Sequence, residues 1–192
     1  MPPSSNESST ESSNGPSNES SNLGAWISRL RERRPEATLA DGLDEIDEMD
    51  REALDTSVGF AAEHARRYVA SGGTDDGWDG PRPILILYTT GRRSGALRRN
   101  PVLYFDHSGR RYVVASKGGA ADHPHWFTNL VARPDVFVRA GAEVYAARAT
   151  VASPQERAEV WPALVAGYPM FAEYQATTTR EIPLVRLDPA GP

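Results

Sequence analysis

The chain has 192 residues, 39% hydrophobic side chains and a formal net charge of −5, and it contains no cysteine. The length fits one domain with an appendage, and the lack of cysteine excludes disulfides, thiol nucleophiles and cysteine-based metal sites. No apolar run approaches the roughly 18 residues that span a bilayer, and no secretion signal opens the sequence, so we expect a cytoplasmic protein.

The two signs of charge are unevenly distributed along the chain. Residues 1–80 carry 17 acidic and 7 basic side chains, whereas residues 81–192 carry 9 acidic and 14 basic ones. The C-terminal part is therefore positive, and a positive field attracts anionic ligands. The acidic N-terminal part argues against a nucleic-acid partner.

The first 57 residues contain little that predicts a packed core. Residues 1–22 are mostly Ser, Asn, Glu, Pro and Gly, which predicts a disordered, low-complexity tail. Residues 23–34 place apolar side chains at helical spacing, and we favour a helix that caps the domain over one that touches a membrane or another subunit. Residues 35–57 are acidic and predict a solvated linker or a frayed helix.

The main domain is predicted to span residues 58–192, and its first half reads as a helix followed by strands. The apolar stripe of 58–70 predicts a helix that stops at a glycine pair. Apolar, β-branched runs predict strands over 84–90, 98–105 and 111–115, the last two joined by a short hairpin turn. A helix is predicted over 122–132, with Asp122 as its N-cap and Pro124 in its first turn.

The second half of this domain repeats the same types of element. Strands are predicted over 135–139, 144–151 and 182–187. A helix with Ser153 as N-cap is predicted to run to about residue 166 and to be broken early by Pro162. An aromatic turn or short helix is predicted over 168–174. Six short strands with hairpin-length links and a few helices indicate a mainly β domain with flanking helices (α+β), a small closed or half-open β-barrel.

Two loops that contain glycine and positive charge each follow a predicted strand. The loop of residues 91–95 offers backbone donors, two arginines and a hydroxyl, and the loop of residues 115–119 contains the only lysine of the chain, Lys117. Arginine pairs bidentately with phosphate and carboxylate, so these loops point to a phosphate-bearing ligand. The alternative is two ordinary hairpin turns with solvated cations. The first loop lacks the Walker pattern, which argues against ATP hydrolysis.

Several other residues have more than one interpretation. His123 and His125 form a His-Pro-His pair, but no third ligand is suitably spaced, so we expect no metal site. Trp126 and Phe127 fit a core or a pocket wall better than a nucleic-acid stacking box. Aromatic residues also recur at every third position from 168 to 174, where they could form core or cover a flat ligand; they are Tyr168, Phe171 and Tyr174.

Three separated stretches resemble one known family. They are TTGRRSGALRRNPVLYF, VVASKGGAADHPHWFTNLVARPDVFV and ERAEVWPALVAGYPMFAEYQATTTREIPLV, and they occur in this order within about residues 58–188. Together they resemble the deazaflavin-dependent nitroreductase family. Its members are oxidoreductases that use coenzyme F420 and have a six-stranded split β-barrel of the FMN-binding type.

The resemblance implies a strongly anionic cofactor and a set of residues that bind it. The positions that match the cofactor-binding motifs are Arg92, Arg93, Ser94, Arg98, Arg99, Asn100, Pro101, Val102, Leu103, Val114, Ala115, Ser116, Lys117, His125, Trp126, Phe127, Thr128, Asn129 and Phe171. Tyr168 and Tyr174 would border the substrate. A proton could come from solvent, Ser116 or Tyr168. The catalytic candidates are Ser116, Tyr168 and Tyr174.

The resemblance implies hydride transfer from reduced F420 to a planar acceptor such as a quinone or a nitroaromatic. Some relatives carry tyrosines where this chain has Leu103 and Phe171. This difference puts reduction of nitro drugs in doubt and gives a quinone-like acceptor, or another activated planar substrate, at least equal standing. The alternatives are an FMN-dependent split-barrel reductase and a non-catalytic F420 carrier. A homodimer is a further expectation, and contact of residues 23–34 with the inner face of the membrane is the alternative to a helix that caps the domain.

Overall fold

A computed structural model of the chain describes residues 50, 51, 53–75 and 82–189. The predicted tail of residues 1–22, the predicted helix of 23–34 and most of the acidic stretch after it lie outside the described residues. In chain order, the elements are β1 (Leu54–Asp55), α3 (Gly59–Ala70), β2 (Ile84–Thr90), β3 (Leu97–His107), β4 (Arg110–Val114), the 3₁₀ turn η1 (Lys117–Gly119), α4 (His125–Ala132), β5 (Asp135–Ala140), β6 (Glu143–Val151), α5 (Pro154–Gly167), α6 (Met170–Ala176) and β7 (Leu184–Pro189).

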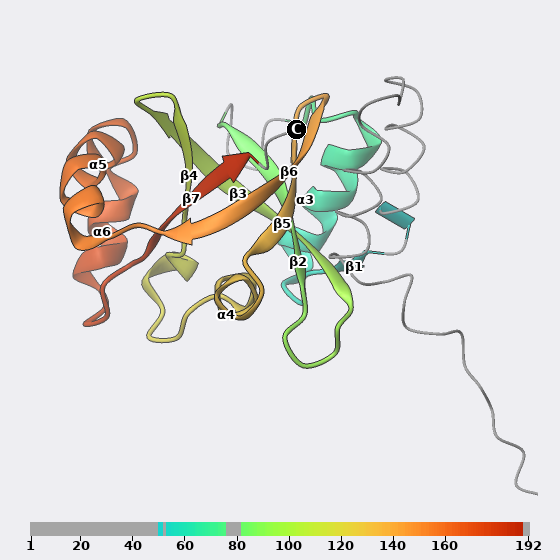
Figure 1. Ribbon diagram of the computed structural model, residues 1–192, viewed down its shortest axis with the longest axis horizontal. Helices are drawn as coiled ribbons and strands as arrows, with labels where there is room; N and C mark the ends of the chain where they lie inside the picture. Colours follow the sequence, from blue (N-terminus) through green and yellow to red (C-terminus); the bar gives the residue numbers. More distant parts are fainter. Residues whose placement is uncertain (1–49, 52, 76–81, 190–192) are drawn as a thin grey trace, which may run out of the picture.

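Six strands form a closed antiparallel ring. Strand β2 pairs with β3 and β5, β5 with β6, β6 with β7, β7 with β4, and β4 with β3, which closes the barrel. This arrangement confirms the predicted six-stranded barrel with flanking helices. Figure 1 shows α3 at one end of the barrel, the α5–α6 pair at the other, and α4 beneath it. None of the described helices has the length and apolar character needed to cross a membrane.

The ring is split along one side of β3. Residues 97–103 of β3 pair with β2, but pairing with β4 covers only 104–107. Leu103 and Val114 would be the next pair in that register, yet these two residues do not pair with each other. A short parallel strand, β1, lies beside Arg98 and Arg99 instead. The chain therefore leaves an opening between the middle of β3 and the end of β4.

The apolar core has three parts, which follow from the alternation of side chains along the strands. On β2, Leu85 and Leu87 point into the barrel, whereas Ile86 and Tyr88 pack toward α3. The third part lies between the barrel and the α5–α6 pair, where Leu164 is fully buried. Both faces of β2 are thus covered, which explains why all seven of its residues are buried.

Two predictions about helices are wrong. Helix α4 begins at His125 and has Pro124 at its N-cap position, so Asp122 does not cap it. The residue before a proline is pushed toward extended backbone, which delays the start of the helix. Helix α5 runs through Pro162 without a break. Pro162 and Ala158, whose carbonyl loses its helical partner there, are both exposed, so water can satisfy that carbonyl.

The described part of the predicted linker lies against the barrel. Asp50 and Ala53 are buried, and Leu54–Asp55 forms strand β1, which the sequence did not predict. A strand of two residues has no hydrophobic periodicity of its own, so only long-range contacts specify it.

Candidate functional site

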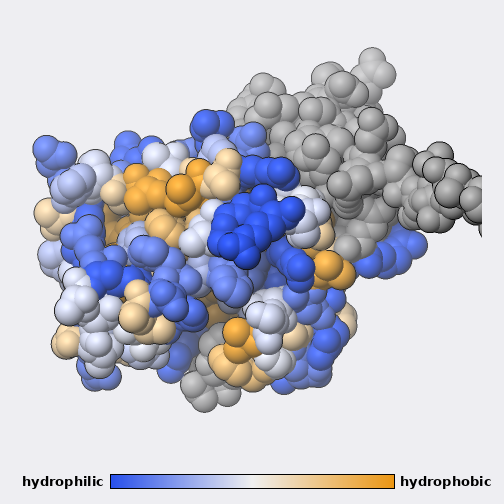
Figure 2. Space-filling model, turned by 90° about the horizontal axis from the view of Figure 1, so that it is seen from below, coloured by the Kyte–Doolittle hydropathy of each residue, from blue (hydrophilic) through white to orange (hydrophobic). Residues whose placement is uncertain are grey.

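The opening in the barrel holds one continuous cleft. It consists of a polar cavity of about 340 Å³ and an apolar cavity of about 670 Å³. The two cavities share the lining residues Thr56, Ser57, Asn100, His125 and Trp126. Figure 2 views the molecule from the side of α4 and the β2–β3 loop, where an apolar surface lies next to a strongly hydrophilic one. The cleft therefore suits a ligand with a polar end and an apolar end.

The polar cavity carries positive charge that the protein leaves available. Arg93 and Arg98 line it, and their guanidinium groups make no hydrogen bond or ion pair with any described residue. The third arginine is partly occupied, because the Arg92 guanidinium donates a hydrogen bond of 2.8 Å to the Thr128 hydroxyl. These two guanidinium groups, which no described residue pairs with, can bind phosphate or carboxylate.

Helix α4 holds the first cationic loop in place. The buried side chain of Asn129 accepts a hydrogen bond of 3.1 Å from the backbone N–H of Arg92 through its Oδ1. Its Nδ2 donates to the Thr89 hydroxyl over 3.4 Å. Within the loop, Gly91 and Ala96 are joined by a backbone hydrogen bond of 2.8 Å. Asn129 thus joins α4, the end of β2 and the loop.

The apolar cavity is flanked by flat and aliphatic side chains. Pro101, Val102 and Leu103 line it from the unpaired part of β3, and Trp126 lines it from α4. Phe171 also lines it and is only 3% exposed. Its ring makes an edge contact with the ring of Tyr174, which also lines the cavity. These surfaces can enclose a flat ring system.

Asn100 lies where the two cavities meet. Its Nδ2 lies 3.4 Å from the carbonyl oxygens of Leu87 and of Arg98. Its Oδ1 accepts no hydrogen bond from the described residues, so this acceptor remains available to a ligand at the junction.

The second cationic loop has an unusual backbone and little room behind it. Lys117, Gly118 and Gly119 have φ angles of 49°, 62° and 80°, a left-handed conformation that glycine tolerates best. A Cβ on Gly119 would lie 2.7 Å from the carbonyl oxygen of Tyr174 and 2.0 Å from the Thr177 hydroxyl. The loop is thus packed tightly against α6, while the exposed Lys117 and its neighbour Ser116 line the cleft.

Arg180 supports this loop from behind. Its guanidinium donates to the carbonyl oxygens of Ala115, Ser116 and Ala120 over 3.2, 2.7 and 2.9 Å. It also lies 3.3 Å from Nδ1 of His123. Burial lowers the pKa of His123, and the charge of Arg180 lowers it further, so a neutral imidazole can accept this hydrogen bond. Within the described residues, no group of three His, Asp or Glu side chains could hold a metal ion.

The structure brings most of the predicted site residues to the cleft. Those that line it are Arg92, Arg93, Ser94, Arg98, Asn100, Pro101, Val102, Leu103, Val114, Ser116, Lys117, His125, Trp126, Asn129, Phe171 and Tyr174. Five others line neither cavity: Arg99, Ala115, Phe127, Thr128 and Tyr168. Ala115 and Phe127 belong to the barrel core, and Tyr168 packs its ring against Phe105 and Phe171.

Sequence reasoning missed one wall of the cleft. Asp55, Thr56, Ser57, Val58, Phe60 and Ala61 line it. The acidic composition of the preceding stretch indicated a solvated linker instead. The sequence offers only a weak signal for this wall, namely two hydroxyl residues, Thr56 and Ser57, directly before the predicted helix of residues 58–70.

Comparisons with known proteins agree with this geometry. The sequence model of the F420H(2)-dependent quinone reductase family matches residues 60–189. A Mycobacterium tuberculosis protein whose name places it among the F420H(2)-dependent quinone reductases is 39% identical over 113 residues, which cover 59% of this chain and 95% of that protein. Another protein of that species, named an F420H(2)-dependent quinone reductase, is 32% identical over 111 residues, 56% of this chain and 74% of that protein.

Two solved structures are similar in fold and sequence. One is titled an F420-H2 dependent reductase; it has a TM-score of 0.51 and 39% identity, and the match covers 56% of this chain and 95% of that one. The other is titled a domain-swapped dimer; it has a TM-score of 0.53 and 35% identity, and the match covers 69% of this chain and all of that one.

Proposed function

Because the chain belongs to the F420H(2)-dependent quinone reductase family, we propose that it transfers a hydride from reduced coenzyme F420 to a quinone. The family match confirms the predicted family and cofactor, and the six-stranded barrel confirms the predicted fold type. The family match also favours the main hypothesis over an FMN-dependent reductase and over a non-catalytic carrier.

The residues of the cleft fit this cofactor. Coenzyme F420 combines a flat deazaflavin ring system with a phosphodiester and a polyglutamate tail. We assign the ring system to the apolar cavity, between Pro101, Trp126 and Phe171, and the anionic tail to the cationic cavity with Arg93 and Arg98. One observation supports this assignment above all: a cavity with two arginine side chains that no described residue pairs with continues directly into an aromatic one.

The protein's own contribution is orientation, charge and exclusion of water. When bound, reduced F420 supplies the hydride, and the chain supplies the surroundings that orient the acceptor. A quinone that takes up one hydride needs one proton to become a hydroquinone. Ser116 and Tyr174 both line the apolar cavity, so either hydroxyl could deliver this proton from solvent.

The proposed function is tested by binding and turnover together. We expect the purified chain to bind F420 in an equilibrium fluorescence titration, to bind FMN weakly, and to oxidise reduced F420 with menadione faster than with a nitroimidazole. Stoichiometric F420 binding without turnover of any acceptor would support the carrier hypothesis instead.

Charge reversal inside and outside the cleft tests whether the cationic loops bind F420. Reversal of Arg92, Arg93 and Lys117 together should abolish F420 binding. Reversal of three exposed arginines outside the cleft, Arg110, Arg133 and Arg148, changes the net charge equally and should preserve most of it. Equal losses in both variants would mean that overall charge, and not this site, governs binding.

We also propose that the chain forms a homodimer, and we keep membrane contact of residues 23–34 as the alternative to a helix that caps the domain. A structure with 35% identity is titled a domain-swapped dimer, which supports self-association, and light scattering after size exclusion would measure it. Contact of residues 23–34 with the inner face of the membrane is tested by co-sedimentation of the full chain with anionic vesicles, compared with a chain that starts at residue 35.

A further inference from the structure

We propose that Asp55 is a positioning residue that fastens one wall of the cleft and thereby sets the affinity for the cofactor. The wall comprises residues 55–61, of which all but Gly59 line the cleft. The proposal rests on F420 as the ligand of this cleft. It extends the proposed function because residues 55–57 lie outside the stretch that matches the family, residues 60–189.

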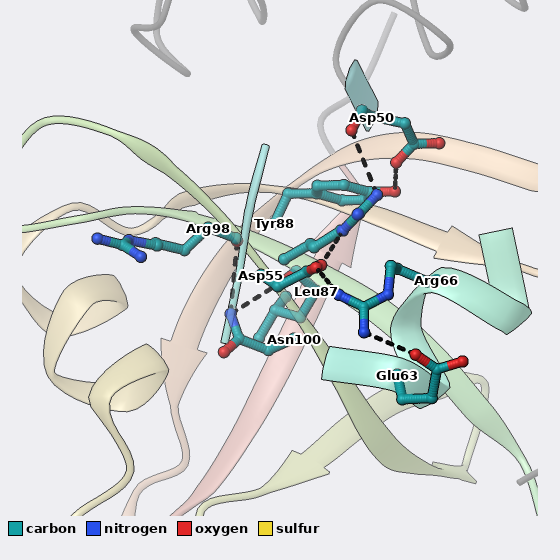
Figure 3. Close-up of polar contacts among 9 residues, drawn as sticks. Asp50, Asp55, Glu63, Arg66, Leu87, Tyr88, Arg98 and Asn100 are labelled. Atoms are coloured by element: carbon teal, nitrogen blue, oxygen red, sulfur yellow. Dashed lines mark hydrogen bonds and ion pairs between the residues drawn. The ribbon is translucent and has the colours of Figure 1, made fainter. Parts of the chain in front are cut away.

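Asp55 joins three elements through its carboxylate. Its Oδ1 accepts a hydrogen bond from Nε of Arg99 on β3. Its Oδ2 accepts one of 2.9 Å from Nη1 of Arg66 on α3, and Arg66 in turn donates to Glu63 over 2.6 Å. Figure 3 shows Asp55 between Arg66 on one side and the β3 strand on the other. The backbone of Asp55 is also in register with Arg99 in the parallel β1–β3 pair.

A second anchor precedes the wall. Nη1 of Arg99 donates over 3.2 Å to the carbonyl oxygen of Asp50. The Asp50 carboxylate accepts a hydrogen bond from the Tyr88 hydroxyl and lies 3.1 Å from Nη2 of Arg139. The Asp50 and Arg139 side chains are only 7% and 9% exposed. Burial, and then the charge of Asp50, raise the pKa of Tyr88, which therefore remains a donor.

These anchors hold the residues that shape both cavities. Thr56 and Ser57, directly after Asp55, line the polar and the apolar cavity alike. The β1–β3 pairing also places Leu54 beside Arg98, one of the two unpaired cations of the polar cavity. If Asp55 released its partners, Thr56 and Ser57 would lose their nearest fixed point, and the junction of the cleft would widen.

The charge of Asp55 separates a positioning role from a purely electrostatic one, because the two roles change F420 affinity in opposite directions. A carboxylate that lines a cationic cavity opposes an anionic ligand, so its removal alone should tighten binding of F420. The positioning role predicts the opposite result. If loss of the ion pairs leaves about a tenth of the molecules with a closed wall, the dissociation constant rises about tenfold.

The experiment compares Asp55→Asn with a matched variant in the full chain. Asp135→Asn removes one carboxylate from an exposed ion pair with Arg148, 3.4 Å long and outside the cleft, and should leave binding unchanged. Two quantities are measured: the dissociation constant of oxidised F420 by fluorescence, and hydrogen–deuterium exchange of residues 54–61 without cofactor. We expect about tenfold weaker binding and faster exchange for Asp55→Asn. Unchanged or tighter binding, or unchanged exchange, would overturn the proposal.

A second variant covers the case in which Asp55→Asn does not fold. Arg66→Gln removes one partner from an exposed position on α3 and should weaken binding less, with exchange that rises over the same residues. If neither quantity changes, the proposal fails. Failure of the wild-type chain to bind F420 would contradict the proposed function, while the exchange measurement would still test whether Asp55 fastens the wall.

Discussion

The guanidinium of Arg180 donates a hydrogen bond of 2.7 Å to the carbonyl oxygen of Ser116 in the second cationic loop. The same group also reaches the carbonyls of Ala115 and Ala120. One side chain from the segment after α6 therefore holds both ends of a loop whose three central residues have positive φ. This support lets the loop keep a backbone conformation that costs free energy.

Replacement of Arg180 by alanine should loosen the loop and destabilise the fold. Hydrogen bonds with a charged donor contribute about 1.5–3 kcal/mol each when the partner is left unsatisfied, but water can reach part of this site, so we expect a total loss of about 2 kcal/mol. Urea unfolding measures it, and F420 affinity should fall as well. Arg180→Lys keeps the charge but not the fork of donors, so it should recover less than half of the loss.

A control for this prediction is Arg148→Ala, which removes an exposed arginine whose ion pair is 3.4 Å long. Such pairs contribute about 0–1 kcal/mol. If Arg148→Ala and Arg180→Ala lower the free energy of unfolding equally, the support from Arg180 is not specific.

Two neighbouring glycines should respond differently to alanine. Gly118 has φ +62° and open space around it, so Gly118→Ala should cost only about 1 kcal/mol of left-handed strain. Gly119 has φ +80° and a backbone oxygen 2.7 Å from the new Cβ, so Gly119→Ala should cost about 2–4 kcal/mol. Urea unfolding of both variants checks the difference, and equal costs would contradict the packing of the loop against α6.

Stability should fall in mild acid because two histidines are held neutral. Burial lowers the pKa of His64, an effect that Asp75 partly opposes; burial and then Arg180 lower that of His123. A histidine with a lowered folded pKa binds protons more readily when unfolded. The stability that such a histidine contributes is fully present above its ordinary pKa of 6.5. It is lost as the pH falls from there through the lower pKa of the folded state.

The measurement is the free energy of unfolding between about pH 8 and pH 5. In His123→Gln the free energy of unfolding should decline less steeply with falling pH, because only His64 then remains of the two histidines. An unchanged slope in this variant would show that His123 is not held neutral by its burial and by Arg180.

The three catalytic candidates can be distinguished because only two of them line the cleft. Ser116 and Tyr174 line the apolar cavity, whereas Tyr168 packs on Phe105 and does not. Loss of a general acid lowers kcat about 10²-fold or more, so we expect this for Ser116→Ala or Tyr174→Phe, with a changed solvent isotope effect. Tyr168→Phe should leave kcat unchanged; a loss confined to Tyr168→Phe would contradict the geometry.

Much of the barrel could be predicted because its strands carry strong local signals. The run Ile84–Thr90 is apolar and β-branched, and the structure has β2 over the same residues. Ser108 and Gly109 have φ of 50° and 74°, as the predicted hairpin between β3 and β4 requires. Ser153 caps α5 by accepting from the N–H of Glu156 over 3.2 Å, as its spacing predicted.

The features that could not be predicted depend on contacts between distant residues. Strand β1 is held by Asp55 and Arg99, which are 44 positions apart. Arg180 binds carbonyl oxygens, and a sequence gives no sign of which backbone groups an arginine will meet. The continuity of α5 through Pro162 depends on which side of the helix faces water, and this is settled only when α5 packs on the barrel.

The wall of residues 55–61 lies outside the ring of six strands. A substitution there leaves the pairing of the six strands untouched, yet it alters a surface that lines both cavities. The shape of the cleft can therefore change while the scaffold that carries it stays the same.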